Sequence, residues 1–482
     1  MTTSPHQQKW SHNVYLGGWT AGSGGTRDVI EPATGQSLGV VGLADTDDLD
    51  RAVGLARTAQ PLWAAVSQED RAAMLRRAGE AFTAMKDAVV TWLVREGGGN
   101  HEKAQFETDL AIRECFAAAA LATHSTGEVV SAAAGELSYS VRTPAGILGV
   151  IPPFNAPLQL AIHSIAPAIA LGNAAILKPD PRAAVSGGMV LAMAFEAAGL
   201  PQGVLSVLPG GADFGEALVV HPGIDVISFT GSTGAGRAVG QAAASHFAKA
   251  HLELGGNSAL LVLPGVDVDW AAHLGAKGSF FHQGQICMAT GRHLVHKDII
   301  DAYIARLAAI AEGLRIGNPI DPDVEIGPII DERQRDRVHA LVVDSVAAGA
   351  RLVTGGTYDG LFYRPTVLTN VGPETPAYAN EIFGPVAVVR SFATDDEAVD
   401  MACDSEYALT LGILTPDVMR GLALAERIPT GAVHINDQTI DDSPLAPMGG
   451  VRASGVGAHF GGTANLDAFT ETRWVTAKSG GV

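Results

Sequence analysis

Residues 146–177 read GILGVIPPFNAPLQLAIHSIAPAIALGNAAIL, and the fold class follows from this stretch. The run GILGVI (146–151) is typical of a buried strand, 158–171 of an apolar helix, and AAIL (174–177) of a second buried strand. A strand, a helix and a strand in succession indicate parallel strands joined by a crossover helix. Such units predict an α/β fold whose sheet is covered on both faces and whose ligands bind beyond the carboxyl ends of the strands.

The same alternation continues along the chain. We expect strands at 204–208 and 225–229, and helices at 185–198, 237–247, 299–314 and 333–348, the last two in a second α/β unit. Earlier in the chain, residues 45–59 carry a helical start signal, with Thr46 as the expected cap.

Length and composition exclude several classes of protein. At about 150 residues per domain, 482 residues indicate roughly three structural units. The net charge of −19 repels phosphates and anionic lipid, so neither nucleic acid nor a membrane is expected as a partner. Three cysteines cannot form a disulfide framework, and the N-terminal MTTSPHQQKW lacks the apolar core of a signal peptide. These features predict a cytoplasmic protein.

A glycine-rich turn follows the strand expected at 225–229. It contains Gly231, Ser232 and Gly236, and a helix is expected to follow it. Glycine lets the backbone approach a ligand closely, and free N–H groups at a helix N-terminus attract phosphate. The fingerprint G-x-G-x-x-G is absent, so the turn fits a nucleotide site or an ordinary turn. Lys178, at the end of strand 174–177, fits a ribose or phosphate contact or a solvated strand end.

Three residues are candidates for catalysis. Cys287 lies between glycines in FFHQGQICMATG (280–291), and a thiol is a good nucleophile toward carbonyl carbon; Cys115 and Cys403 are expected to be inert. Glu253 precedes a Gly-Gly turn and fits a general base or an edge-strand carboxylate. Asn155, flanked by prolines, fits an oxyanion donor or a turn former.

Other chemistries lack their motifs. His101-Glu102 begins like a zinc-protease motif, but position 105 is Gln, and no CxxC pair occurs, so no metal site is expected. No G-x-S-x-G elbow is present, which argues against a serine hydrolase. A cysteine hydrolase in which Cys287 pairs with His282 or His293 remains an alternative.

Seven stretches, in their order along the chain, resemble landmarks of the aldehyde dehydrogenase superfamily. They are PPFN (152–155), ILKP (176–179), FTGSTGAG (229–236), LELGGN (252–257), GQICMA (284–289), EIFGPV (381–386) and PMGGVRASGVG (447–457). FHQGQICMATGRHLVH (281–296) and TGAVHINDQ (430–438) most resemble the bacterial benzaldehyde, salicylaldehyde and vanillin dehydrogenases.

The resemblance implies a division of the chain into domains. A Rossmann-like cofactor-binding domain would comprise residues 1–121 and 145–253, and an α/β catalytic domain residues 254–450. A small β extension for oligomerisation would comprise 122–144 and 464–482. Homodimers or homotetramers are usual in the family.

The resemblance also implies a mechanism for oxidising an aromatic aldehyde to its carboxylic acid. Cys287 would attack the aldehyde to give a thiohemiacetal, whose oxyanion Asn155 and the Cys287 N–H would bind. Hydride transfer to the nicotinamide would leave a thioester, and Glu253 would activate the water that hydrolyses it. A broad aliphatic or semialdehyde dehydrogenase of the same fold is the main alternative.

Cofactor contacts are implied in the same way. Lys178, Gly231, Ser232, Gly236, Glu381 and Phe383 would bind the nucleotide. Many NAD-preferring relatives carry a Glu where this chain has Pro181, followed by Arg182. Loss of that carboxylate removes its repulsion of a 2′-phosphate, so both NAD and NADP are candidate cofactors.

The candidate substrate pocket is apolar and contains aromatic side chains, which would suit a benzaldehyde ring. Phe154 replaces the Trp that commonly precedes the oxyanion Asn, and His459 and Phe460 stand where some relatives have a second glutamate. His163 is expected to bond a ring hydroxyl. The expected lining residues are Phe154, Leu160, His163, Phe281, Ile286, Met288 and Phe460.

Overall fold

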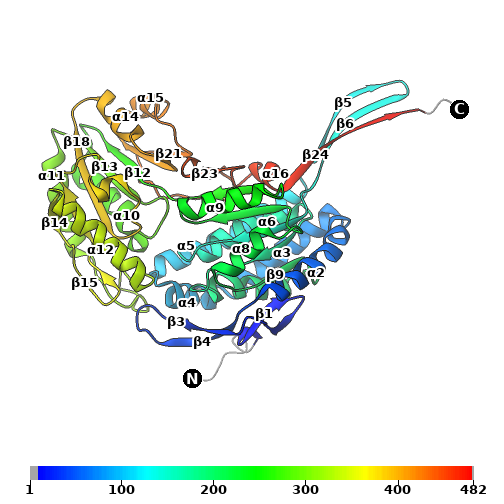
Figure 1. Ribbon diagram of the computed structural model, residues 1–482. Coiled ribbons are helices and arrows are strands. Elements are labelled where there is room, and N and C mark those ends of the chain that lie inside the picture. The colour runs from blue at the N-terminus through cyan, green and yellow to red at the C-terminus, as the bar shows by residue number, and fades with distance from the viewer. Residues whose placement is uncertain (1–8, 480–482) are drawn as a thin grey trace.

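A computed structural model describes residues 9–479, which form two sheets side by side with helices on their faces, and a narrow arm that projects from one of them (Figure 1). Residues 1–8 and 480–482 lie outside the described part, and with them most of the N-terminal stretch and the last residues of the expected extension. No helix within the described range is long and apolar enough to cross a bilayer.

The first sheet has eight strands in the order β2-β1-β9-β8-β7-β10-β11-β23. Its five central strands are parallel, whereas β1, β2 and β23 are antiparallel to their neighbours. The bounds are β1 (Asn13–Leu16), β2 (Trp19–Ala21), β7 (Ile147–Ile151), β8 (Ala174–Leu177), β9 (Leu205–Val207), β10 (Val226–Thr230), β11 (Lys249–Glu253) and β23 (Gly455–Val456).

Helices cover this sheet on both faces, as the apolar strands predict. Along β7, Leu148 and Val150 belong to one core and Ile147 and Ile151 to the other, because successive side chains of a strand point to opposite faces. The first core is closed by α3 (Gln68–Ala84), α4 (Lys86–Gly97), α5 (His101–Ala122), α6 (Pro157–Ala170) and α7 (Val190–Ala197). The second is closed by α2 (Thr46–Ala64), α8 (Ala212–Val220) and α9 (Thr233–Ala244).

The expected elements of this half are present, with three corrections. A π-helical turn, Val185–Met189, precedes α7 where one continuous helix was expected. Helix α9 begins inside the glycine-rich stretch rather than at 237, because Ser232 caps its first turn. The cap of α2 is Asp45 and not Thr46; the Asp45 carboxylate accepts from two backbone N–H groups of the first turn.

The second sheet has seven strands in the order β14-β17-β18-β13-β12-β20-β21, all parallel except β14. They are β12 (Ser258–Val262), β13 (Thr290–His296), β14 (Arg351–Thr354), β17 (Thr366–Thr369), β18 (Val386–Phe392), β20 (Thr410–Leu414) and β21 (Ala432–Ile435). Helices α10 (Val268–Phe280) and α11 (Ile300–Gly313) cover one face. The other face is covered by α12 (Glu332–Ala347), α13 (Pro376–Ala379), α14 (Asp395–Cys403) and α15 (Val418–Ala425).

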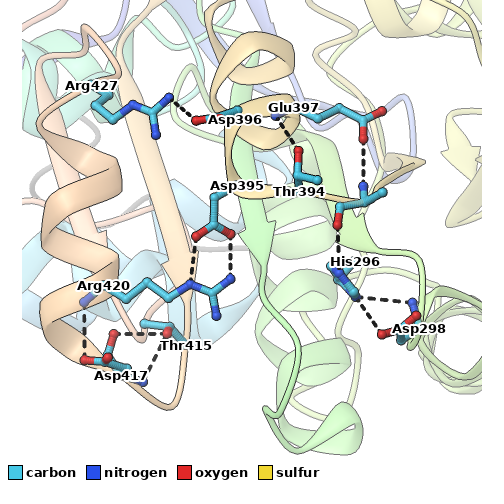
Figure 2. A network of polar contacts seen from close by, with 11 residues as sticks. His296, Asp298, Thr394, Asp395, Asp396, Glu397, Thr415, Asp417, Arg420 and Arg427 are labelled. Atoms are coloured by element: carbon cyan, nitrogen blue, oxygen red, sulfur yellow. Dashed lines mark hydrogen bonds and ion pairs between the residues drawn. The ribbon is translucent and has the colours of Figure 1, made fainter.

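Ion pairs join α14 to α15 at the surface of the second sheet (Figure 2). Asp395 binds Arg420 through both carboxylate oxygens, at 2.5 and 2.9 Å, and Asp396 binds Arg427 at 2.7 Å. The Arg420 guanidinium holds the pKa of Asp395 below its usual value. All four side chains are partly exposed, so we expect this network to orient the two helices more than to stabilise the fold.

The arm consists of β5 (Gly127–Ala133), β6 (Glu136–Pro144) and β24 (Thr470–Lys478), and extends away from the rest of the molecule (Figure 1). Strands far apart in sequence pair along its whole length, from Thr470 with Pro144 to Lys478 with Glu136. Val129, Val130 and Trp474 are exposed on it, at 67%, 65% and 72%. Smaller hairpins join β3 (Thr26–Ile30) to β4 (Ser37–Gly42) and β15 (Tyr358–Asp359) to β16 (Phe362–Tyr363).

Candidate active site

Two cavities meet at the boundary between the sheets. A cleft of about 570 Å³ lies at the carboxyl ends of the first sheet's parallel strands, and a slot of about 50 Å³ lies beside α5 and α6. Asn155, Leu160 and Cys287 line both of them. We name these cavities the cleft and the slot; the thiol of Cys287 belongs to their common wall.

The loop that carries Cys287 is held in an unusual backbone conformation. His282, Gln283 and Gly284 all have positive φ, of 51°, 57° and 64°. A left-handed conformation is unfavourable for non-glycine residues, so surrounding contacts must hold it. The Gln283 amide supplies them, since its Nε2 donates to the carbonyl oxygens of Gly98 (2.7 Å) and Pro328 (2.9 Å).

The Cys287 thiol is in a poor environment for ionisation. Burial and the nearby carboxylates of Glu381 and Glu253 raise the pKa of Cys287 to about 12, and the Met288 N–H only partly opposes them. The resting thiol is therefore protonated at neutral pH, and its use as a nucleophile requires a base that removes the proton.

Asn155 lies just beyond the carboxyl end of β7, before the helix α6 begins at Pro157. The residue is buried, and its side-chain Oδ1 has no hydrogen-bond partner. Within residues 9–479 the side-chain amide nitrogen donates to no other group either, so its N–H groups are available to an acceptor in the cavities that Asn155 lines. This placement fits an oxyanion donor better than a turn former.

Glu253 is the last residue of β11 and is buried. Its Oε2 accepts from the Gly450 N–H at 3.1 Å, and it is absent from the described linings of the cleft and the slot. Burial raises its pKa well above the ordinary carboxylate value, the Gly450 N–H lowers it, and the charge of Asp442 raises it further. The Glu253 carboxyl therefore does not line the junction of cleft and slot, and its side chain must rotate to contact a ligand bound there.

The cleft has features that suit a phosphate. The N–H groups of Ser232, Thr233 and Gly234, in the first turn of α9, are free of intrahelical bonds, and Ser232 Oγ caps this turn. Lys178 and Gly231 line the same cleft. Burial lowers the pKa of Lys178, more than the charge of Asp180 raises it.

Gly236 differs from the expectation, because it does not line the cleft. Its N–H already donates to the Ser232 carbonyl (2.9 Å), and a Cβ there would lie 2.2 Å from a Leu254 side-chain carbon. This glycine lets helix α9 approach β11 and has no free N–H to offer a ligand.

Toward Cys287 the cleft is bounded by Glu381 and Phe383. Glu381 accepts from the Gly256 N–H at 3.1 Å, and burial raises its pKa to about 7. A Cβ at Gly255 would lie 2.4 Å from Glu381 Oε2, so this close approach requires glycine. Phe383 packs edge-on against Phe154 at 5.9 Å, and both rings line the cleft.

The arginine beside the strand end is already engaged. Arg182 binds Asp180 through Nε (3.0 Å) and Nη2 (2.8 Å), Asp331 through Nη1 (2.7 Å), and lies 4.2 Å above the Phe154 ring. Its charge is therefore compensated by two carboxylates. Arg182 lines the cleft, but its positive charge is already used by these carboxylates and is not free to attract a 2′-phosphate.

The slot matches four of the expected pocket residues, namely Leu160, Phe281, Ile286 and Met288. Phe154 lines the cleft instead, because its ring packs under Arg182. His163 and Phe460 are absent from the described lining of the slot. They are buried behind it and pack on each other, with ring centres 6.2 Å apart.

Five polar residues of the slot were not recognised from the sequence: the buried Lys103, Glu107, Gln159 and Asp442, and the exposed Asp441. Lys103 and Glu107 form a buried ion pair, and Glu107 also accepts from the N–H groups of Leu158 and Gln159. Gln159 donates to Asp442, 283 positions away in sequence. The one available signal was the position of Gln159 in the first turn of the helix that follows Asn155.

The structure offers Cys287 no histidine partner among residues 9–479. His293 is bound to Ser279 Oγ and to the Tyr303 hydroxyl, both at 2.7 Å, and burial lowers its pKa to about 3. Neither ring nitrogen of His282 has a hydrogen-bond partner. These contacts weigh against the cysteine hydrolase. In the same part of the chain, no group of three or more His, Cys, Asp or Glu side chains is placed to hold a metal ion.

A partly buried cysteine at the junction of a nucleotide-sized cleft and an apolar slot is the arrangement expected of an enzyme that forms a covalent intermediate beside a bound nucleotide. The chain belongs to the aldehyde dehydrogenase family, whose model matches residues 19–475.

Curated relatives match over nearly the whole length. The chain is 57% identical to a vanillin dehydrogenase of Amycolatopsis sp., over 98% of this chain and 97% of the relative. It is 44% identical to a benzaldehyde dehydrogenase [NAD(+)] of Pseudomonas putida, over 99% of this chain and 98% of the relative.

Solved structures share the fold. Betaine aldehyde dehydrogenase of Staphylococcus aureus in complex with NAD+ superposes with a TM-score of 0.95 at 28% identity, over 99% of this chain and 96% of that one. An NADP-dependent enzyme of E. coli superposes with a TM-score of 0.94 at 29% sequence identity, over 98% of this chain and 99% of that one. The expected α/β aldehyde dehydrogenase fold is confirmed.

Proposed function

We propose that this protein oxidises aromatic aldehydes of the benzaldehyde, salicylaldehyde or vanillin type to carboxylic acids, with NAD or NADP as hydride acceptor. The observation that carries the proposal is the position of Cys287, which lines both the cleft and the apolar slot. The relatives named for vanillin and benzaldehyde support the substrate class.

The cleft fits a dinucleotide. Its volume of about 570 Å³ lies in the usual range for cofactor sites, and glycine at 255 leaves room beside Glu381 that a Cβ would fill. We infer that Lys178, Gly231, Ser232 and the free N–H groups of α9 hold the adenosine and phosphate portion. When bound, NAD or NADP supplies the acceptor for the hydride that leaves the substrate carbon. Glu381 and Phe383 orient the end of the cofactor nearest Cys287.

Three residues of the chain supply the nucleophile, the oxyanion donor and the general base. Cys287 Sγ adds to the aldehyde carbon, and the thiol proton leaves to solvent water. The Asn155 amide and the Cys287 N–H stabilise the oxyanion of the thiohemiacetal. After hydride loss a thioester joins Sγ to the acyl carbon. Glu253, rotated from Gly450, takes a proton from water, and the water oxygen displaces the thiolate to release the acid.

Replacement of Asn155 by Ala is expected to lower kcat by about 10²- to 10³-fold with little change in nucleotide affinity, because one oxyanion donor is lost. The measurement is steady-state kinetics with benzaldehyde together with a nucleotide titration. Asn380→Ala, an exposed Asn that donates only to the Pro376 carbonyl, is the matched control and should leave kcat within about twofold. Equal rates for the wild type and Asn155→Ala would contradict the proposed oxyanion site.

A substrate panel run with each nucleotide in turn tests the function. We expect kcat/KM for benzaldehyde or vanillin to exceed that for hexanal and succinate semialdehyde by at least tenfold, since the slot is mainly apolar and contains the aromatic rings of Phe106 and Phe281. An aliphatic substrate that is better by tenfold would overturn the aromatic assignment and favour the broad aliphatic alternative. The better nucleotide in the same panel identifies the cofactor. Ester hydrolysis independent of nucleotide would favour the hydrolase.

We propose further that the protein works in the cytoplasm as a homodimer or homotetramer, with the domain limits expected above. The arm, with Val129, Val130 and Trp474 exposed, supports its role as the oligomerisation extension. The change from the first sheet to the second between β11 and β12 supports a boundary after Glu253. Light scattering coupled to size exclusion gives the subunit number.

A further inference from the structure

Most polar residues around the slot are already satisfied or assigned. Lys103 and Glu107 bind each other and the start of α6, and Asn155 belongs to the oxyanion site. The side walls are apolar, formed by Phe106, Leu160, Phe281, Ile286, Ile440 and Met448. Asp442 is the remaining buried charge in this lining, at 8% exposure.

The two oxygens of the Asp442 carboxylate differ. Oδ2 accepts from Gln159 Nε2, whereas Oδ1 is buried and has no hydrogen-bond partner in the part of the chain that the structure describes. A buried carboxylate oxygen without a donor is costly, so a ligand that supplies an O–H gains the full strength of a charge-assisted bond. Gln159 lines the slot too and fixes the orientation of the carboxylate.

A second group of buried residues supports Asp442 from behind. His163 Nε2 lies 3.9 Å from Asp442 Oδ1 and 3.5 Å from Glu114 Oε2. Burial lowers the pKa of His163, but the charges of Asp442 and Glu114 more than compensate and raise it overall. At 3.9 Å His163 Nε2 is beyond hydrogen-bond distance from Asp442 Oδ1, so this oxygen remains able to accept from a ligand, while the two carboxylates favour the charged form of the imidazole.

We propose that Asp442 accepts a hydrogen bond from a phenolic hydroxyl on the substrate ring, so that the slot selects hydroxybenzaldehydes over benzaldehydes without a hydroxyl. The inference deepens the proposed function and rests on it. A benzene ring is rigid, so its hydroxyl lies at a fixed distance from the formyl carbon held at Cys287. A substrate without the hydroxyl leaves Oδ1 buried and unpaired, which penalises its transition state.

The size of the slot sets a condition on this binding. Its volume of about 50 Å³ is below the roughly 150 Å³ of a cavity that takes up benzene, so side chains must shift to admit a ring. Met288 and Met448 line the slot, and methionine changes rotamer at low cost. The widened slot still contains the Asp442 carboxylate, because Gln159 holds it.

The test compares hydroxyl with methyl at each ring position. In the wild type, at least one of the 2-, 3- and 4-hydroxybenzaldehydes should exceed the methylbenzaldehyde of the same position in kcat/KM by roughly 10- to 100-fold, the effect of a hydrogen bond to a charged acceptor. Asp442→Asn should remove most of this ratio, because Gln159 then binds the amide oxygen and the NH₂ faces the slot. Methylbenzaldehyde kinetics should change less than hydroxybenzaldehyde kinetics.

Asp437→Asn is the matched control. It removes the same charge from an exposed residue of the same segment that lines neither the slot nor the cleft, and its amide oxygen can still accept from the Gln438 N–H, so the hydroxyl-to-methyl ratio should persist. Melting curves check that both variants fold. If Asp442→Asn does not fold, the hydroxyl-to-methyl ratios of kcat/KM in the wild type test the inference alone.

Wild-type ratios within threefold of one at all three positions would overturn the inference, while turnover of benzaldehyde would leave the proposed function intact. An equal loss for hydroxyl and methyl substrates in Asp442→Asn would also overturn it, since Asp442 would then act only through Glu253 or the fold. Failure of every aromatic aldehyde would overturn the proposed function and this inference together.

Discussion

Replacement of Cys287 by Ala is expected to abolish aldehyde oxidation, with a loss in kcat on the order of 10⁴- to 10⁶-fold. An aldehyde carbon donates hydride readily only after a nucleophile has added to it, and Cys287 carries the one thiol at the junction of cleft and slot among the described residues. The cleft itself is unchanged by the substitution, so the affinity for nucleotide should stay within about threefold. Absorbance of the reduced nicotinamide measures kcat, and calorimetric titration measures the affinity for nucleotide.

The chain provides a matched control for this experiment. Cys403 is also only partly buried but lies at the end of α14, near the Arg427 carbonyl and outside both cavities. Cys403→Ala should retain normal turnover. If Cys287→Ala kept more than about 1% of wild-type kcat, the thiol would not be the nucleophile and the mechanism would have to be replaced.

Glu253→Gln is expected to separate the two halves of the reaction. The amide keeps an oxygen that can accept from the Gly450 N–H, so the fold should be preserved, but it cannot take a proton from water. Hydride transfer would then occur once per subunit and the acyl-enzyme would accumulate, with steady-state turnover lower by about 10²- to 10⁴-fold. Rapid mixing should show a near-stoichiometric burst of reduced nicotinamide, and mass spectrometry the acyl adduct.

Glu96→Gln is a suitable control, because Glu96 is equally buried but binds the N–H groups of Val185 and Ser186. It should show no burst. Loss of the burst itself in Glu253→Gln would mean that Glu253 acts before hydride transfer, as the base for the Cys287 thiol.

The wild-type pH profile follows from the same carboxyl. A free Glu side chain has a pKa of roughly 4.3, and the raised pKa of Glu253 keeps its carboxyl protonated to a higher pH. Only the ionised carboxylate can accept a proton from water. Turnover limited by deacylation should therefore rise with pH through this raised pKa and be lost as the pH falls.

The sequence allowed much of the fold to be predicted, because its decisive signals are local. The strand expected at 174–177 is β8 to the residue, since four apolar residues stand between turn formers. Helix starts were less predictable: α9 begins among glycines, where propensity argues against a helix, yet Ser232 caps it. The family landmarks placed Cys287 and Asn155 in one site, where they indeed line the same cavities.

The remaining features depend on packing between distant segments. His163 was expected to bond a ring hydroxyl, but it is absent from the described lining of the slot, whereas Asp442, from the other end of the chain and 3.9 Å from His163 Nε2, is part of that lining. Nothing in the run DDSP (441–444) distinguishes a buried acceptor from a surface turn, because the burial of Asp442 is produced by α6 and its partner Gln159. Gly236 was assigned to the ligand because its motif lies on the cleft, whereas its missing side chain serves the packing of a helix on a strand.

The wall shared by the cleft and the slot has a consequence for how the two cavities can change. Because Asn155, Leu160 and Cys287 border both of them, a substitution at any of the three alters the space on both sides. The nucleotide site and the aldehyde site proposed above therefore cannot be reshaped independently at this wall.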